Sequence, residues 1–200
     1  MRKNGFISKV KSKNQKKLYL LLIGLALLAI IFGLLFIFMI SKDNKDFLST
    51  NYIKYFEDTN GSIALLFKTI FNYFIYIIVI WILGISIIGI PIVLFIFLFK
   101  NFLFGFSISS IINSFGFKGI LISLIDLFPH KFLFLIVMLL ISFYSLSFSI
   151  KLIRHLFLKK PINFREAMNK YFKILVISLS VSIFISLYEV FISSYLIKLI

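Results

Sequence analysis

The sequence predicts an all-α fold, a polytopic membrane helical bundle with five transmembrane helices and one short re-entrant or interfacial helix. Three observations predict this class. Hydrophobic residues make up 61% of the 200 residues and charged residues 14%, and the mean hydropathy is +1.08. Several apolar runs reach the roughly 20 residues that cross a hydrocarbon core. The formal net charge of +15 is concentrated in blocks beside these runs, which is typical of charge that sets membrane orientation.

The chain begins with a basic segment, residues 1–17, which has seven lysines and arginines and no acidic residue. We expect this lead to lie in the cytoplasm and to contact anionic lipid. The apolar run at 18–40 has 23 residues and is too long for the core of a signal peptide. We therefore expect it to be the first span of a single transmembrane domain that covers 18–200.

The polar segment at 41–62 has a net charge of −1, which suits the outer side of the membrane. Four of its apolar and aromatic residues fall on one helical face: Leu48, Tyr52, Tyr55 and Phe56. This pattern predicts a short helix that lies on the membrane interface. Asn60-Gly61 then predicts a turn, and Ser62 is placed to cap the next helix.

The second span is predicted at about 63–88 and the third at about 91–113. Gly89 and Pro91 divide them, because proline suits the first turn of a helix and glycine suits the turn before it. Together with Gly84, these residues predict a tight hairpin on the cytoplasmic side that fixes how the two spans approach each other.

The apolar run at 119–128 has 10 residues, so a helix there is about 15 Å long, half of a ~30 Å hydrocarbon core. Pro129 is expected to restart the chain before a fourth span at about 131–150. The following segment, 151–173, has a net charge of +6. If 119–128 crossed the membrane, one basic block would lie outside, against the positive-inside rule. We therefore expect 119–128 to stay on the outer side and the fifth span, 174–197, to end outside.

Small and polar residues form stripes along three of the spans. The stripe on the third span has members four residues apart: Asn101, Gly105, Ser109 and Asn113. Serines form similar stripes on the fourth and fifth spans: Ser142, Ser145, Ser149, Ser178, Ser182, Ser186 and Ser193. Such stripes let helices approach closely and hydrogen-bond to one another. The alternative is that they line a polar path.

Lys100 and Glu189 are the deepest charges in the predicted spans. A charge at mid-bilayer costs roughly 3 kcal/mol on insertion scales and usually faces the bundle. One alternative is that the two pair across spans three and five. The other is that Lys100 reaches the inner interface while Glu189 bonds to the serine stripe. A second group of charges, Asp126, His130 and Lys131, is expected to form an ordinary solvated rim on the outer side.

No set of residues for catalysis or metal binding is found in the sequence. The two histidines, His130 and His155, are predicted on opposite sides of the membrane, and the chain has no cysteine. A zinc site needs several such ligands together, and no glycine-rich phosphate loop is present. We expect no enzyme activity, no cofactor and no metal. We also expect no nucleic-acid partner, because a polybasic segment beside a span is typical of a lipid contact.

A set of short motifs carries a resemblance to a known family. They include Trp81–Pro91 with the sequence WILGISIIGIP, then Lys100, Gly105-Phe106, Phe117-x-Gly119, the turn at Pro129, and Tyr188-Glu189-x-Phe191-Ile192-Ser193. In their order and spacing, these motifs make the chain resemble the stage II sporulation protein M family of endospore-forming bacteria.

The resemblance implies a non-enzymatic scaffold of the engulfment machinery. Such a protein would anchor and place two peptidoglycan-degrading partners, the stage II sporulation proteins D and P, in the mother-cell septal or engulfing membrane. The residues alone leave an alternative open, a small transporter or channel that uses Lys100, Glu189 and the polar stripes.

Overall fold

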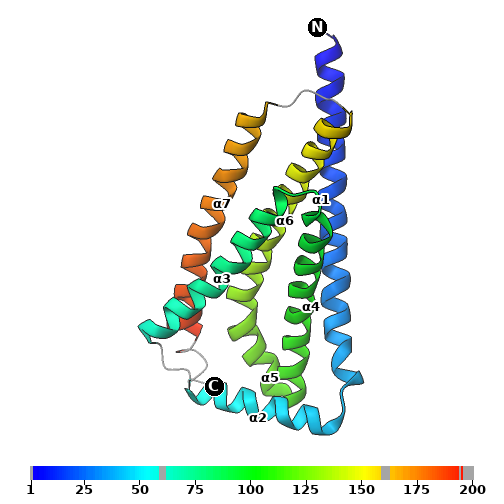
Figure 1. Ribbon diagram of the computed structural model, residues 1–200. Helices are drawn as coiled ribbons and strands as arrows, with labels where there is room; N and C mark the ends of the chain where they lie inside the picture. The colour runs from blue at the N-terminus through cyan, green and yellow to red at the C-terminus, as the bar shows by residue number, and fades with distance from the viewer. Residues whose placement is uncertain (1, 59–61, 159–162, 194, 196–200) are drawn as a thin grey trace.

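The computed structural model describes residues 2–58, 62–158, 163–193 and 195. Every regular element in this part of the chain is helical. Five of the helices are long and apolar enough to cross a membrane, and they run up and down as an elongated bundle (Figure 1). The predicted all-α membrane bundle with five spans is therefore confirmed.

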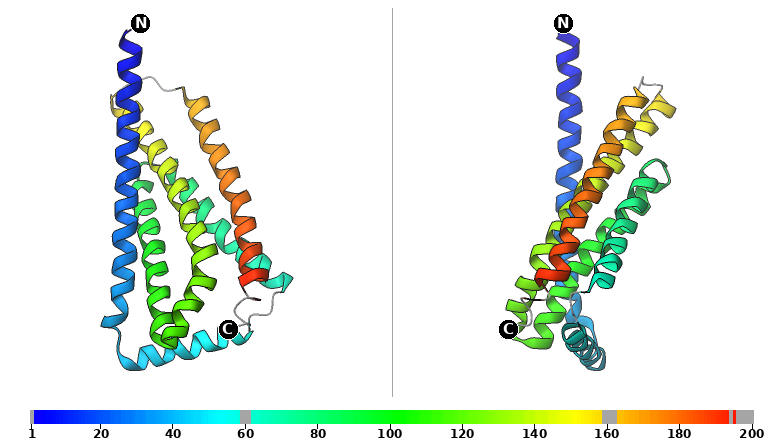
Figure 2. Two further views of the ribbon diagram at one scale, coloured as in Figure 1. Left: turned by 180° about the vertical axis from the view of Figure 1, so that it is seen from behind. Right: turned by 90° about the vertical axis from the view of Figure 1, so that its left-hand side faces the viewer.

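The helices follow one another with short connections. In chain order they are α1 (Arg2–Phe36), a 3-10 turn (Ile37–Met39), α2 (Lys42–Asp58), α3 (Ile63–Gly84), α4 (Gly89–Phe115), α5 (Phe117–Ile122), a π-helical segment (Ser123–Leu127), α6 (Phe128–Leu158), α7 (Phe164–Leu187) and a second π-helical segment (Tyr188–Ser193). We call the end of the bundle that carries α2 and α5 the α2 end. The start of α1, the last turn of α6 and the start of α7 lie toward the opposite end (Figures 1 and 2).

The central helix of the bundle is α6. Its apolar span is 61% buried, whereas the spans of the other four helices are between 11% and 33% buried. Its inner face contributes several residues to the main core, where they pack with side chains from every other long helix. Core residues include Leu22, Ile77, Ile80, Phe97, Met138, Ile141, Leu175 and Ile185. Because α6 touches the others, a polar group on it can reach α3, α4 or α7.

Helices α1 and α4 lie side by side, and glycines bring their backbones together. A Cβ added at Gly105 would overlap the carbonyl of Ile30, and one at Gly33 would overlap the carbonyl of Phe102. Small residues at such crossings let two backbones touch within a membrane. Gly105, predicted as part of a packing stripe, is thus the point at which α4 meets α1.

The hairpin between α3 and α4 is present, but its boundaries differ from the prediction. Helix α3 ends at Gly84 rather than at about residue 88, and α4 begins at Gly89, so that Pro91 lies in its first turn. The four residues between them form the turn. A Cβ at Gly89 would overlap the carbonyl of Leu83. The absence of a side chain at Gly89 therefore lets the chain reverse within so few residues. Ser149 of α6 donates a 2.6 Å hydrogen bond to the Gly84 carbonyl and fixes the turn to the central helix.

The segment after α4 was predicted only in part. The chain reverses at Gly116, whose φ of 58° favours glycine, and α5 returns along α4 with Gly119 against the Ile111 carbonyl. Residues 119–128 are helical, as predicted, but they are divided among α5, the π-helical segment and the start of α6. The predicted break at Pro129 is wrong, because α5, the π-helical segment and α6 form one helical run from 117 to 158. The fourth long helix begins at Phe128 rather than at about 131. The N–H of Phe128 donates to the Ser123 carbonyl, and a proline without an N–H is tolerated in the turn that follows.

Other predicted elements are longer than expected. Helix α1 includes the basic lead as well as the first span, and α7 joins the predicted surface segment before residue 174 to the fifth span. The predicted interfacial helix is α2, and Tyr52 packs its ring against a second core cluster at that end. The side chains of Tyr55 and Phe56, the turn at Asn60-Gly61 and the end of the fifth span beyond 195 lie outside the described residues. Ser62 caps α3 as predicted, since its hydroxyl accepts from the N–H of Leu65 at 3.1 Å.

Candidate functional site

A polar cleft lies between α3 and α4, two helices that diverge from their hairpin toward the α2 end (Figures 1 and 2). Its volume is about 340 Å³. Four helical segments line it: α3, α4, α6 and the π-helical segment after α7. The lining residues that matter below are Asn72, Tyr73, Tyr76, Lys100, Lys131 and Glu189. Three of these six residues carry a charge, namely Lys100, Lys131 and Glu189, which sets the cleft apart from the apolar surface around it.

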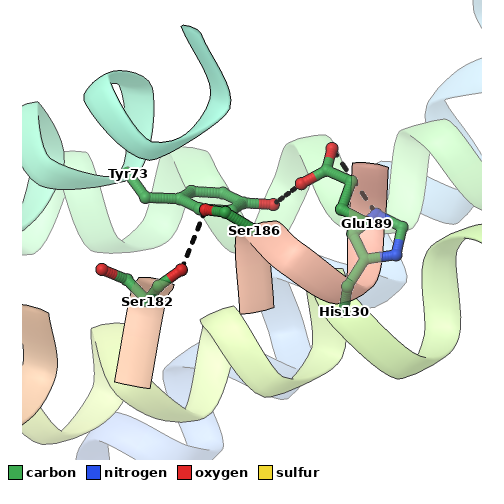
Figure 3. A network of polar contacts seen from close by, with 5 residues as sticks. All are labelled: Tyr73, His130, Ser182, Ser186 and Glu189. Atoms are coloured by element: carbon green, nitrogen blue, oxygen red, sulfur yellow. Dashed lines mark hydrogen bonds and ion pairs between the residues drawn. The ribbon is translucent and has the colours of Figure 1, made fainter. Parts of the chain in front are cut away.

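One wall of the cleft is a polar network centred on Glu189 (Figure 3). The Tyr73 hydroxyl donates a 2.5 Å hydrogen bond to Oε2 of Glu189. The Nε2 atom of His130 lies 3.7 Å from Oε1 of the same carboxylate. These three residues come from α3, α6 and the segment after α7, so the network ties three helices together. Glu189 is still 17% exposed toward the cleft.

Two lysines also line the cleft. Nζ of Lys100 lies 3.4 Å from the ring centroid of Tyr76, a cation–π contact between α4 and α3. Lys131, in the first turn of α6, lines the same cleft. The two charges predicted to be deepest, Lys100 and Glu189, thus line one cavity, and each has an aromatic residue of α3 as a neighbour.

The stripe predicted on the third span divides into two parts. Asn101 and Gly105 are buried, and the Asn101 amide donates to the Phe97 carbonyl at 2.8 Å. Ser109 is half-buried and donates to the Phe106 carbonyl, while Asn113 is exposed. The uncharged polar residue of this helix that lines the cleft is Ser107, which lies on a different face of α4 from the predicted stripe.

The serine stripes are buried between helices and do not line the cleft. All seven serines are less than 5% exposed. Ser145 donates to the Ile80 carbonyl of α3 at 3.0 Å, which joins α6 to α3. Ser182 and Ser186 donate instead to carbonyls within their own helix, at 2.8 and 2.9 Å, which satisfies their hydroxyls without a partner helix.

The predicted solvated rim at His130 is wrong. His130 is fully buried, because its position in the first turn of α6 points the ring at Glu189 rather than outward (Figure 3). Lys131 is half-buried, and the side chain of Asp126 lies outside the described residues. Sequence reasoning also missed Tyr73 and Tyr76. Their spacing of three within an apolar span indicates that they share one face of α3. On that face, Tyr73 contacts Glu189 and Tyr76 contacts Lys100.

Gly84, Gly89, Pro91 and Pro129 lie at turns and helix starts, away from the cleft. Among the described residues, no three side chains of histidine, cysteine, aspartate or glutamate gather as a group able to hold a metal ion. The geometry therefore brings together Lys100 and Glu189 of the predicted site residues, and adds Tyr73, Tyr76, His130 and Lys131.

Comparison with protein families matches residues 21–194 to the family described as Stage II sporulation protein M. The matched region begins within α1 and extends past the last π-helical segment, so it includes the hairpin, the cleft and the Glu189 network. No curated protein and no solved structure matches the chain. Because the match covers most of the 200 residues, the chain belongs to the stage II sporulation protein M family.

Proposed function

We propose that this sporulation-related, multi-pass membrane protein is a non-enzymatic scaffold that anchors and places septal peptidoglycan hydrolases during engulfment of the forespore. The observation that carries the proposal is the family match, which covers part of the first long helix and all or nearly all of the other four. The expected partners are the stage II sporulation proteins D and P. The expected location is the mother-cell septal or engulfing membrane.

The α2 end supports this proposal with a surface for partners. Helix α2 lies across the lower ends of the spans (Figure 1), and its Phe47 is 67% exposed. Phe117, at the turn between α4 and α5 on the same end, is 91% exposed. Aromatic side chains are enriched where proteins bind one another. We propose that the α2 end faces outward, where wall hydrolases act, and that the basic lead lies in the cytoplasm.

The proposed topology is testable because the chain has no cysteine of its own. We expect a cysteine at Asn51, an exposed residue of α2, to react with a membrane-impermeant maleimide in intact cells. A cysteine at Arg165, exposed at the start of α7, is expected to react only after the membrane is permeabilised. The opposite labelling pattern would place the α2 end in the cytoplasm and rule out direct contact with extracytoplasmic hydrolases.

The scaffold role predicts that a tagged chain recovered from sporulating cells carries the D and P proteins with it. Replacing both Phe47 and Phe117 by alanine is expected to reduce this recovery several-fold, because truncating an interface anchor typically costs more than about 1 kcal/mol. The matched control is Phe157→Ala, a 75% exposed phenylalanine near the opposite end of α6, which should leave recovery unchanged. Absence of both hydrolases from the wild-type sample, together with normal engulfment after deletion of the gene, would refute the scaffold.

The transporter alternative has less support, because the serine stripes proposed to line its path are packed between helices. Of its predicted residues, Lys100 and Glu189 do face a cavity. A cavity lined by charges is also what a binding site needs, and the charges of this cleft favour a particular class of ligand.

A further inference from the structure

No acidic residue in the described part of the chain forms an ion pair with either lysine of the cleft. Within the described residues, neither Lys100 nor Lys131 forms an ion pair or a hydrogen bond, and the contact of Lys100 with the Tyr76 ring uses the face of an uncharged group. An ammonium carries three N–H donors. A charged group within a membrane span usually faces a partner or a water-filled cavity. The arrangement of these two amines therefore points to an anion as the missing partner.

Glu189 does not supply that partner. Its Oε2 accepts the hydrogen bond from Tyr73, and its Oε1 faces His130 (Figure 3). The carboxylate is thus directed at the wall formed by α3 and α6. The two amines and the one carboxylate that line the cleft give it a net charge of +1 when all three are ionised, so an entering anion is attracted.

The rest of the lining is divided into polar and apolar parts. Thr69, Asn72 and Ser107 offer hydroxyl and amide donors, whereas Leu103, Phe134 and Leu135 offer an apolar surface. The volume of about 340 Å³ is within the range of small-ligand sites. A ligand that matches both parts has an anionic head and an apolar portion that continues along the membrane-facing side of the helices.

We propose that this cleft binds a phosphate group through Lys100 and Lys131, and that the phosphate belongs to an anionic lipid that enters from the bilayer. Tyr73 and Tyr76 form the side of the cleft on α3, and the apolar residues of α6 contact the start of the lipid chains. The proposal does not depend on the scaffold role, since a lipid bound between α3 and α4 is compatible with any partner at the α2 end.

The test uses the full chain purified in a neutral detergent and a fluorescent phosphatidic acid as the probe. Unlabelled phosphatidic acid is expected to displace the probe, and diacylglycerol, which has the same chains without the phosphate, is not. Lys100→Gln and Lys131→Gln are each expected to weaken binding at least about 5-fold, the factor that corresponds to about 1 kcal/mol for one lysine near an anionic lipid. Lys100→Arg should retain binding, because it keeps the charge.

Lys68→Gln is the matched control, since Lys68 is exposed on α3 and does not line the cleft. Thermal unfolding of each variant in the same detergent shows whether it is folded, and Lys131→Gln carries the test if Lys100→Gln does not fold. Equal binding by wild type and by both glutamine variants would overturn the proposal, as would displacement by diacylglycerol. Displacement by inorganic phosphate as strong as that by phosphatidic acid would overturn the lipid assignment and identify free phosphate as the ligand.

Discussion

Gly105→Val is expected to lower the stability of the bundle by about 3 kcal/mol or more, because it places a branched side chain where two backbones touch. The new Cβ would overlap the carbonyl of Ile30 and come within 3.1 Å of the Ile30 Cα. These are backbone atoms of α1, so no side-chain rotation relieves the overlap. Overpacking of a tight contact typically costs 1–3 kcal/mol, occasionally more, and here the two helices must separate. The midpoint of thermal unfolding in detergent measures the effect.

Gly24→Val is the matched control for this experiment. Gly24 lies in the same helix as Ile30, but a Cβ added there meets no atom within 4 Å. A surface change of this kind is usually within about 0.5 kcal/mol of wild type. If Gly24→Val lowers the unfolding midpoint as much as Gly105→Val, glycine in these helices matters for a reason other than the crossing of α1 and α4.

The spacing of Asn101, Gly105, Ser109 and Asn113 predicted a close helix contact, and Gly105 makes one. It did not predict which helix would be the partner. In a membrane, both the lipid-facing and the core-facing residues are apolar, so hydrophobic periodicity does not distinguish the inner face of a span. Gly33 lies within the long apolar run of α1, where nothing in the local sequence marks it as the residue that meets α4. For the same reason, the spacing predicts that Asn113 belongs to the packing face, whereas Asn113 is exposed in the structure.

The turn between α4 and α6 shows a second limit. Gly116 reverses the chain by its positive φ. In the sequence, however, Pro129, thirteen residues later, is the stronger signal for a helix boundary. A proline permits two outcomes, a break or a place in the first helical turn. The π-helical segment at 123–127 that carries the chain into α6 has no sequence signature of its own. The sequence therefore predicts His130 on a solvated rim, whereas the structure buries it in the first turn of α6, close to Glu189.

That proximity makes the Glu189 network the second site at which one substitution is expected to have a large effect. Glu189→Leu removes the carboxylate that accepts from Tyr73 and that faces His130. Both neighbours then remain in the protein interior with an apolar group in its place. Loss of one partner from a buried polar contact costs about 1–3 kcal/mol. We expect a decrease in the free energy of unfolding of this size, measured by denaturation in detergent.

A double-mutant cycle distinguishes a network from simple loss of packing. Tyr73→Phe deletes the hydroxyl and keeps the ring that stacks on Phe134 at 4.1 Å. If the hydroxyl and the carboxylate stabilise each other, the double variant with Glu189→Leu is less destabilised than the sum of the singles, by a coupling of about 0.5–3 kcal/mol. Tyr144→Phe, a change on the 36% exposed Tyr144 of α6, should add to Glu189→Leu without coupling. Additivity in both cycles would mean that Glu189 holds α3 to α7 by volume alone, and that its charge serves the cleft rather than the fold.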